Sequence, residues 1–223
     1  MPVKVKVCGL RRAEDATVAI EAGATYLGVV YAGGPRTVTG REVKEIVEVA
    51  GEIPVLAVWG SPDLEAILRS RDAAGFRGVQ LHGGSDRSLV ESLRSNGLLV
   101  WRVARLADAA GLDGLPELCD GADAVLVEPR VPGKEGGAGV ALDLDLARAA
   151  RSEFDRAHEA RSTKHALFAL AGGLTPSTVA HAIRTVRPDI VDVSSGVESA
   201  PGVKDPHLIQ TFLEQALADL SSP

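Results

Sequence analysis

The amino-acid sequence predicts an α/β protein, a single (β/α)8 or TIM barrel over residues 1–223, and three observations lead to it. Eight short runs rich in Val, Leu and Ile alternate with segments of helical periodicity, at a repeat of about 25 residues. The runs are continuously apolar rather than alternating, as expected of parallel strands that are buried on both faces. The last two runs end in small residues, at the place where barrels of this kind often bind a phosphate.

The strands are expected where an apolar run is bounded by turn residues or by a helical pattern. In chain order they are residues 3–7, 26–30, 55–58, 78–81, 98–103, 124–127, 166–171 and 190–193. A helical segment after each strand fits a closed barrel better than a doubly wound sheet. A nucleotide-binding sheet would carry Gly-x-Gly-x-x-Gly after its first strand, whereas this chain has Cys8-Gly9-Leu10-Arg11-Arg12 there.

The helices between the strands are predicted by apolar stripes and by start signals. Two stripes have helical spacing: Val43, Ile46, Val47 and Ala50, and Leu64, Ile67 and Leu68. Ser61 followed by Pro62 predicts an N-cap and a first helical residue, because proline lacks the N–H that this position leaves unpaired. Thr175 and Pro176 repeat the same signal before the seventh helix.

Size, charge and cysteine content narrow the class of protein. A chain of 223 residues with 45% hydrophobic content can bury one large core. No run approaches the roughly 20 apolar residues of a membrane span, and residues 1–20 lack a signal-peptide pattern, so we expect a cytoplasmic protein without a membrane partner. The net charge of −6 argues against a nucleic-acid partner. Cys8 and Cys119 form neither a disulfide framework nor a zinc-binding spacing.

The ends of the last two strands together predict a phosphate site. The seventh run breaks into Gly172-Gly173-Leu174-Thr175-Pro176, and the eighth breaks into Ser194-Ser195-Gly196. A helix-like segment follows each break, so backbone N–H groups at two helix N-termini would favour an anion by hydrogen bonding and by the helix dipole. The alternative is that these glycines only form turns and helix C-caps.

Titratable residues at the carboxyl ends of the strands are the candidates for chemistry. They are Cys8, Arg36, His82, Arg102, Arg105, Glu128 and Asp192. A thiol at a strand mouth near helix N-termini would favour its thiolate and act as a base or nucleophile, although most free cysteines are simply buried hydrophobes. An apolar mouth would raise the pKa of Glu128 toward that of a general acid, with a capped or salt-bridged glutamate as the equal alternative.

Residues 129–140 form the longest glycine-rich segment and follow the sixth strand. A loop of this length in a compact barrel is more often an active-site lid than a segment without function. The alternative interpretation is a mobile surface insertion.

Six sequence motifs, in order along essentially the whole chain, resemble those of the phosphoribosylanthranilate isomerases, the barrel enzymes of tryptophan biosynthesis. The motifs are Lys6-Val7-Cys8-Gly9, Gly34-Pro35-Arg36, Val79-Gln80-Leu81-His82-Gly83, Gly136-Gly137-Ala138-Gly139, Leu170-Ala171-Gly172-Gly173-Leu174, and Val191-Asp192-Val193-Ser194-Ser195-Gly196-Val197-Glu198 with Pro201-Gly202-Val203-Lys204-Asp205. A lone Gly-Gly would not carry such a resemblance.

The resemblance implies an isomerase with a small phosphosugar substrate, N-(5-phosphoribosyl)anthranilate. A metal-free Amadori rearrangement would convert it to 1-(2-carboxyphenylamino)-1-deoxyribulose 5-phosphate, so no cofactor is expected. By resemblance, Cys8 is the general base and Glu128 is the general acid. Arg36 would pair with the anthranilate carboxylate, and Asp192 would accept a hydrogen bond from the anthranilate nitrogen. The phosphate would lie on the backbone of Gly172, Gly173, Ser195 and Gly196.

The chain departs from the family pattern at two places. Aspartate is the family's residue where this chain has Glu128. The acidities differ little, roughly 3.9 against 4.3. The extra methylene moves the carboxyl by about 1 Å, which can cost on the order of a hundredfold in rate. Tyr31-Ala32-Gly33-Gly34 also replaces a bulkier stretch before Arg36. We therefore predict an active isomerase with a reduced rate or a less strict choice of aromatic acid.

Three other functions are alternatives to this one. A sugar-phosphate isomerase of histidine biosynthesis would use two aspartates and a second phosphate site, for which this chain offers only His82-Gly83-Gly84-Ser85. A metal-dependent pentose-phosphate epimerase would need His and Asp ligands at several strand ends. A non-catalytic phosphosugar-binding barrel, in which Glu128 marks loss of the acid, is the alternative from a different class. Monomer and homodimer both remain open.

Overall fold

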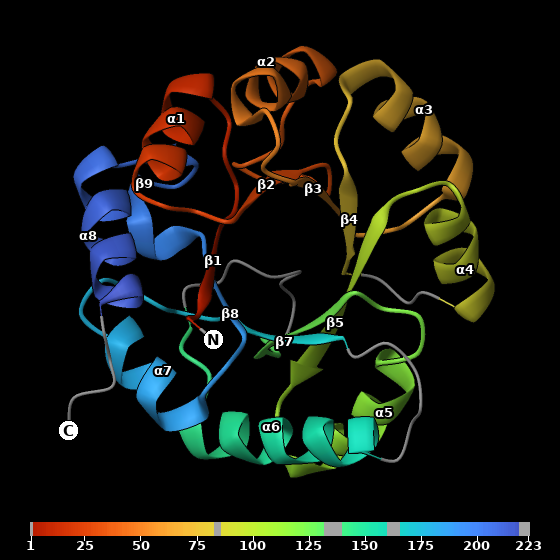
Figure 1. Cartoon of the computed structure of the whole chain (residues 1–223), viewed down its shortest axis with the longest axis vertical. Coiled ribbons are helices and arrows are strands. Elements are labelled where there is room, and N and C mark those ends of the chain that lie inside the picture. Colours follow the sequence, from red (N-terminus) through yellow and green to blue (C-terminus); the bar gives the residue numbers. More distant parts are fainter. Residues whose placement is uncertain (1, 83–85, 132–139, 160–165, 219–223) are drawn as a thin grey trace.

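The computed structural model describes residues 2–82, 86–131, 140–159 and 166–218, which form the closed parallel barrel that the sequence predicts (Figure 1). Neighbouring strands pair in chain order, and the last strand pairs with the first. The strands are β1 Lys4–Val7, β2 Tyr26–Val30, β3 Val55–Trp59, β4 Gly78–Leu81, β5 Leu99–Leu106, β6 Ala124–Pro129, β7 Leu167–Leu170 and β8 Ile190–Val193.

Helices surround the barrel and cover its outer face (Figure 1). They are α1 Ala13–Glu21, α2 Gly40–Ala50, α3 Leu64–Ala74, α4 Arg87–Ser95, α5 Leu115–Leu118, α6 Leu144–Glu159, α7 Val179–Val186 and α8 Pro206–Leu217. The connection after β5 departs from the pattern, because the 3-10 helix η1, Ala109–Gly114, leads into the single turn of α5. Within the described ranges, no helix has the length and apolar character needed to cross a membrane.

Two predicted helix starts are wrong by a few residues. Asp63, not Ser61, is the N-cap of α3, and its carboxylate accepts from Ala66 N at 2.8 Å. A carboxylate is a strong cap because it also interacts favourably with the helix dipole. The turn at Thr175 precedes α7, whose regular part begins after Thr178.

The segment after β8 also differs from the helix that the sequence predicts. A single 3-10 turn, η2 Ser195–Val197, leads into a two-stranded hairpin of β9, Glu198–Ala200, and β10, Val203–Lys204. Helix α8 begins only after this hairpin, with Asp205 as its N-cap. The hairpin therefore stands at the mouth of the barrel, between the last strand and the last helix.

Strand β6 shows how a strand of this barrel divides its side chains between the two faces of the sheet. On β6, Val125 and Val127 belong to the large core between the sheet and the helices, whereas Ala124 and Leu126 belong to a smaller cluster inside the barrel. This alternation follows from the two-residue period of a strand. By the same period, Glu128 faces the barrel interior.

Strand β5 is longer at its carboxyl end than the predicted range 98–103, and its two arginines lie on opposite faces of the sheet. Arg102 points outward, where its Nη1 donates to the carbonyl of Glu117 at 2.8 Å. Arg105 lies three residues later, on the interior face, and pairs in register with Glu128 of β6. Arg102 is therefore not a residue of the barrel mouth, and Arg105 is.

Candidate active site

The thiol of Cys8 lies inside the barrel, immediately beyond the end of β1. Cys8 is two residues after Lys6 and shares its face, and the backbone N–H of Cys8 still donates to Val193 O at 2.8 Å. A Cβ atom added to Gly28 of β2 would come within 2.7 Å of Cys8 Sγ and 3.1 Å of Lys6 Cε. Glycine at position 28 thus leaves the space that the thiol occupies.

Lys6 lies deeper in the barrel than this thiol and is held there by two partners. Its side chain is fully buried and donates to Asp192 Oδ1 at 2.9 Å and to Gln80 Oε1 at 2.8 Å. The ammonium group also lies 5.5 Å from the ring of Trp101, which fills the interior below it. A buried ammonium is tolerated only when it is paired in this way.

A line of polar contacts connects Lys6 with Glu128. Gln80 Nε2 lies 2.7 Å from His82 Nε2, and Arg105 Nη2 lies 2.9 Å from His82 Nδ1. Arg105 Nε donates to Glu128 Oε1 at 3.1 Å. Lys6 can only donate, so Gln80 must turn its amide nitrogen toward His82. A neutral imidazole accepts at one nitrogen, so the Gln80 and Arg105 contacts compete for it.

The pKa values of Cys8 and Lys6 are coupled through their proximity. Burial raises the pKa of the Cys8 thiol, and the Lys6 ammonium works against that rise. Burial disfavours the charged form of Lys6, but Asp192 and Cys8 outweigh it and raise the lysine pKa. Lys6 thus stays charged and is the principal cation that can stabilise a thiolate at Cys8.

The pKa values of Glu128 and His82 are governed by burial. Burial raises the pKa of the Glu128 carboxyl, while Arg105 opposes this change. Burial and then the positive charges of Arg105 and Lys6 lower the pKa of His82 to about 3. His82 is therefore neutral at ordinary pH, and Glu128 holds a proton more readily than an exposed glutamate does.

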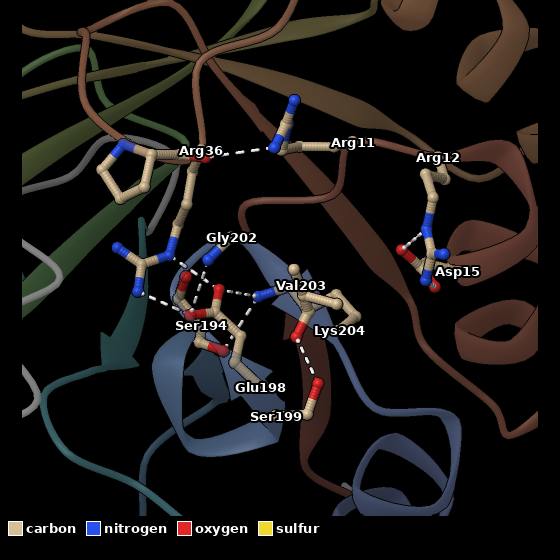
Figure 2. A network of polar contacts seen from close by, with 11 residues as sticks. Arg11, Arg12, Asp15, Arg36, Ser194, Glu198, Ser199, Gly202, Val203 and Lys204 are labelled. Carbon is tan, nitrogen blue, oxygen red and sulfur yellow. Dashed lines mark hydrogen bonds and ion pairs between the residues drawn. The ribbon is translucent and has the colours of Figure 1, made fainter.

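Arg36 reaches the same mouth from the loop after β2, but it is already paired. Its Nε and Nη2 donate to the two oxygens of Glu198 at 2.7 and 2.8 Å, as Figure 2 shows. In the described part of the chain, Arg36 Nη1 has no protein partner. Asp192 is likewise occupied by Lys6. Both residues lie at the predicted place, each with a partner that the sequence analysis did not assign.

The four residues predicted to bind phosphate lie where β7 and β8 end. Gly172 and Gly173 have φ of 102° and 61°, values that L side chains rarely adopt. A Cβ atom on Gly173 would come within 2.6 Å of Ala141 N, and one on Gly196 would overlap the carbonyl oxygen of Leu174. The two loops therefore touch each other through backbone, with Ser195 opening the 3-10 turn beside them.

Backbone donors are left over at these loops. Among the described residues, the N–H groups of Gly172, Gly173, Ser195 and Gly196 donate to no protein acceptor. N–H groups without a protein acceptor are what an anion requires. Most of the predicted lid, residues 132–139, and residues 83–85 of the weak second anion site lie outside the described residues.

No group of three or more metal-ligating side chains occurs in the described ranges.

Four residues of the mouth carried no role in the sequence prediction: Lys6, Gln80, Glu198 and Lys204. A signal for the first was available, because Lys6 stands two residues before Cys8 and must share its face in a strand. The Glu198 and Lys204 contacts depend on the hairpin after β8, which the sequence did not predict. The pair of Arg36 and Glu198 joins residues 162 positions apart and has no local signature.

Comparison with known proteins identifies the family. The family model for N-(5'-phosphoribosyl)anthranilate isomerase matches residues 5–215. The enzyme of that name from Symbiobacterium thermophilum is 37% identical over 220 residues, covering 95% of this chain and 97% of that protein. The crystal structure of phosphoribosyl anthranilate isomerase from Thermotoga maritima has a TM-score of 0.82 and 28% identity, covering 96% of this chain and 98% of that one.

A second solved structure is a phosphoribosyl anthranilate isomerase in complex with reduced 1-(o-carboxyphenylamino)-1-deoxyribulose 5-phosphate. It has a TM-score of 0.80 and 27% identity, covering 96% of this chain and 98% of that one. The sequence and structure matches agree with each other and extend over nearly the whole chain. The chain belongs to the N-(5'-phosphoribosyl)anthranilate isomerase family, the isomerases of tryptophan biosynthesis.

Proposed function

We propose that this protein converts N-(5-phosphoribosyl)anthranilate to its 1-deoxyribulose isomer, with Cys8 as general base and Glu128 as general acid. One observation carries the proposal: both side chains face the barrel interior, and the Lys6–Asp192 pair influences the pKa of each. A base and an acid that act on the same sugar must reach one pocket from different sides. Strands β1 and β6 lie on different sides of the ring, separated by β7 and β8.

The acid step begins with a protonated Glu128. Its proton passes to the furanose ring oxygen, the bond from C1 to that oxygen breaks, and the nitrogen lone pair forms an iminium ion. The rise in the Glu128 pKa on burial supports this role, because it increases the fraction of molecules in which the acid is protonated near the working pH. Arg105 then stabilises the carboxylate that remains, through the contact at 3.1 Å.

The base step uses the Cys8 thiolate. The sulfur takes the proton from C2, and the electrons of that C–H bond form the C1–C2 double bond and neutralise the nitrogen. The resulting enolamine tautomerises to the ketone. Lys6 supports this step because its ammonium favours the thiolate against the cost of burial.

The remaining predicted residues would hold the substrate. Arg36 would offer its Nη1 edge to the anthranilate carboxylate, and Asp192 would accept from the anthranilate nitrogen while it stays paired with Lys6. The free backbone N–H groups beside β7 and β8 would bind the phosphate. A single barrel domain, a cytoplasmic location and a monomeric or homodimeric state are parts of the same proposal.

The test is an assay of the purified protein with freshly prepared phosphoribosylanthranilate, following the loss of anthranilate-type fluorescence. Turnover without added metal supports the proposal. Tight binding of the substrate without turnover would instead identify the non-catalytic phosphosugar-binding barrel.

A further inference from the structure

Three charged side chains form a buried cluster at one side of the mouth, which we call the Glu198 cluster: Arg36, Glu198 and Lys204 (Figure 2). Their side chains are 15%, 4% and 1% exposed, respectively. Burial would raise the pKa of Glu198, but Arg36 and Lys204 outweigh burial and hold it below its ordinary value. Two cations share one carboxylate, so the formal charge of the cluster is one positive unit, while burial lowers the pKa of Lys204.

Glu198 is held by more donors than Arg36 alone. Lys204 Nζ donates to Glu198 Oε1 at 2.9 Å and to Ser194 O at 2.8 Å, and Gly202 N donates to Glu198 Oε2 at 3.2 Å. These contacts fix the carboxylate on the hairpin of β9 and β10. Both of its oxygens then face the Arg36 guanidinium in the parallel geometry that arginine forms with a carboxylate.

The loop that carries Arg36 is held by Arg11, whose Nη1 donates to Pro35 O at 3.4 Å, but among the described residues only Glu198 accepts from the Arg36 guanidinium. Gly33 and Gly34 have φ of 86° and 88°, and a Cβ atom on either would meet nothing within 4 Å. The stem of Arg36 packs over Gly9, where an added Cβ atom would lie 2.6 Å from Arg36 Cδ. Gly9 directly follows Cys8, so the Arg36 side chain lies close to the proposed base.

We infer that Glu198 is the positioning residue that makes the mouth specific for a substrate with an aromatic carboxylate. This inference rests on the proposed function, in which Arg36 binds that carboxylate. Glu198 holds Nε and Nη2 of Arg36, so that Nη1 is the edge presented to the ligand. The net positive charge of the Glu198 cluster is balanced when an anionic group arrives, and a neutral aromatic amine would leave it unbalanced.

The test variant is Glu198→Gln, assayed with phosphoribosylanthranilate and with the carboxylate-free analogue phosphoribosylaniline. Loss of the fork lets Arg36 move away from Lys204, so KM for the carboxylate substrate rises on the order of tenfold while kcat changes little. The preference for the carboxylate substrate over the analogue falls by a similar factor. Asp15→Asn is the matched control, because Asp15 is also a buried carboxylate that bonds an arginine, Arg12 (Figure 2), at 2.9 and 2.6 Å. Its KM should stay at the parental value.

A double-mutant cycle separates positioning from general support of the fold. If Glu198 acts through Arg36, Glu198→Gln adds no further rise in KM to an Arg36→Met variant. Additive effects, or an unchanged substrate preference in Glu198→Gln, would overturn the inference. An inactive parental protein would instead refute the proposed function, so the two failures are distinguishable.

A second measurement needs no change at position 198. In the parental protein, the Arg36 Nε–H should give a slowly exchanging ¹⁵N resonance, assigned by its loss in Arg36→Lys. That resonance should persist when reduced 1-(o-carboxyphenylamino)-1-deoxyribulose 5-phosphate is added, because the ligand binds the other edge. Its disappearance on binding, or its absence throughout, would contradict the inference.

Discussion

Cys8 and Glu128 have pKa shifts in the same direction, and this sets the pH dependence of the reaction. Burial raises both values, and the ordinary pKa of a glutamate lies about four units below that of a cysteine, so we expect the carboxyl of Glu128 to titrate before the thiol of Cys8. Between the two, most molecules hold a carboxylate and a thiol, and a minor fraction holds the active pair of carboxylic acid and thiolate. That fraction is constant between the two pKa values.

The expected pH profile of kcat/KM is therefore a bell with a flat top. On the acid side, activity falls because Glu128 becomes protonated in every molecule while Cys8 remains a thiol. On the alkaline side, activity falls because Cys8 becomes a thiolate in every molecule while Glu128 remains a carboxylate. His82 has a pKa of about 3 and should add no limb between about pH 5 and 9. A limb near the ordinary histidine pKa that vanishes in His82→Asn would contradict this account.

At the scale of elements, Gly28 of β2 leaves the space that the Cys8 thiol, just beyond β1, occupies inside the barrel. Gly28→Ala would place a methyl group 2.7 Å from Cys8 Sγ, closer than van der Waals contact allows. We expect kcat to fall on the order of ten- to a hundredfold because the sulfur is displaced. The free energy of unfolding should fall by about 1–3 kcal/mol from overpacking.

The control for this substitution is Gly114→Ala, at a glycine where an added Cβ atom meets nothing within 4 Å. Kinetic constants and thermal unfolding of both variants can be measured side by side. If Gly28→Ala lost stability but kept the parental kcat, the space left by Gly28 would be structural only.

The loops after β7 and β8 depend on another close approach. Gly196→Ala would drive a methyl group into the carbonyl of Leu174 and push the two loops apart. KM for the phosphorylated substrate should rise about tenfold or more, as charge-assisted bonds to the phosphate are lost. Inhibition by inorganic phosphate should weaken in parallel, and the same Gly114→Ala protein serves as reference. Unchanged phosphate inhibition would remove these loops from the proposed phosphate site.

For the whole molecule, the barrel could be predicted because buried parallel strands have a strong local pattern. The runs at 26–30, 78–81 and 190–193 coincide with β2, β4 and β8. The carboxyl end of β5, residues 104–106, was missed because Arg105 interrupts the apolar run, although it lies in the strand. The β9–β10 hairpin was missed because its strands of 3 and 2 residues are too short to show an alternating pattern.

The site was predictable only in part for the same reason. The alternation of a strand places Cys8 and Glu128 inside a closed barrel, so their common location follows from the fold. Which charged groups neutralise one another does not follow from it. Lys6 with Asp192, Arg36 with Glu198 and Arg105 with Glu128 each join distant parts of the chain.

The most direct test of the account compares the parental protein with Cys8→Ser and Glu128→Gln in the phosphoribosylanthranilate assay. Both substitutions nearly preserve shape, so binding of the reduced product analogue should persist and report an intact pocket. Each variant should lose turnover by on the order of a thousandfold, since general acid–base groups contribute about 10²–10⁴-fold. Near-parental turnover in either variant, with the analogue still bound, would contradict the roles assigned to that thiol and that carboxyl.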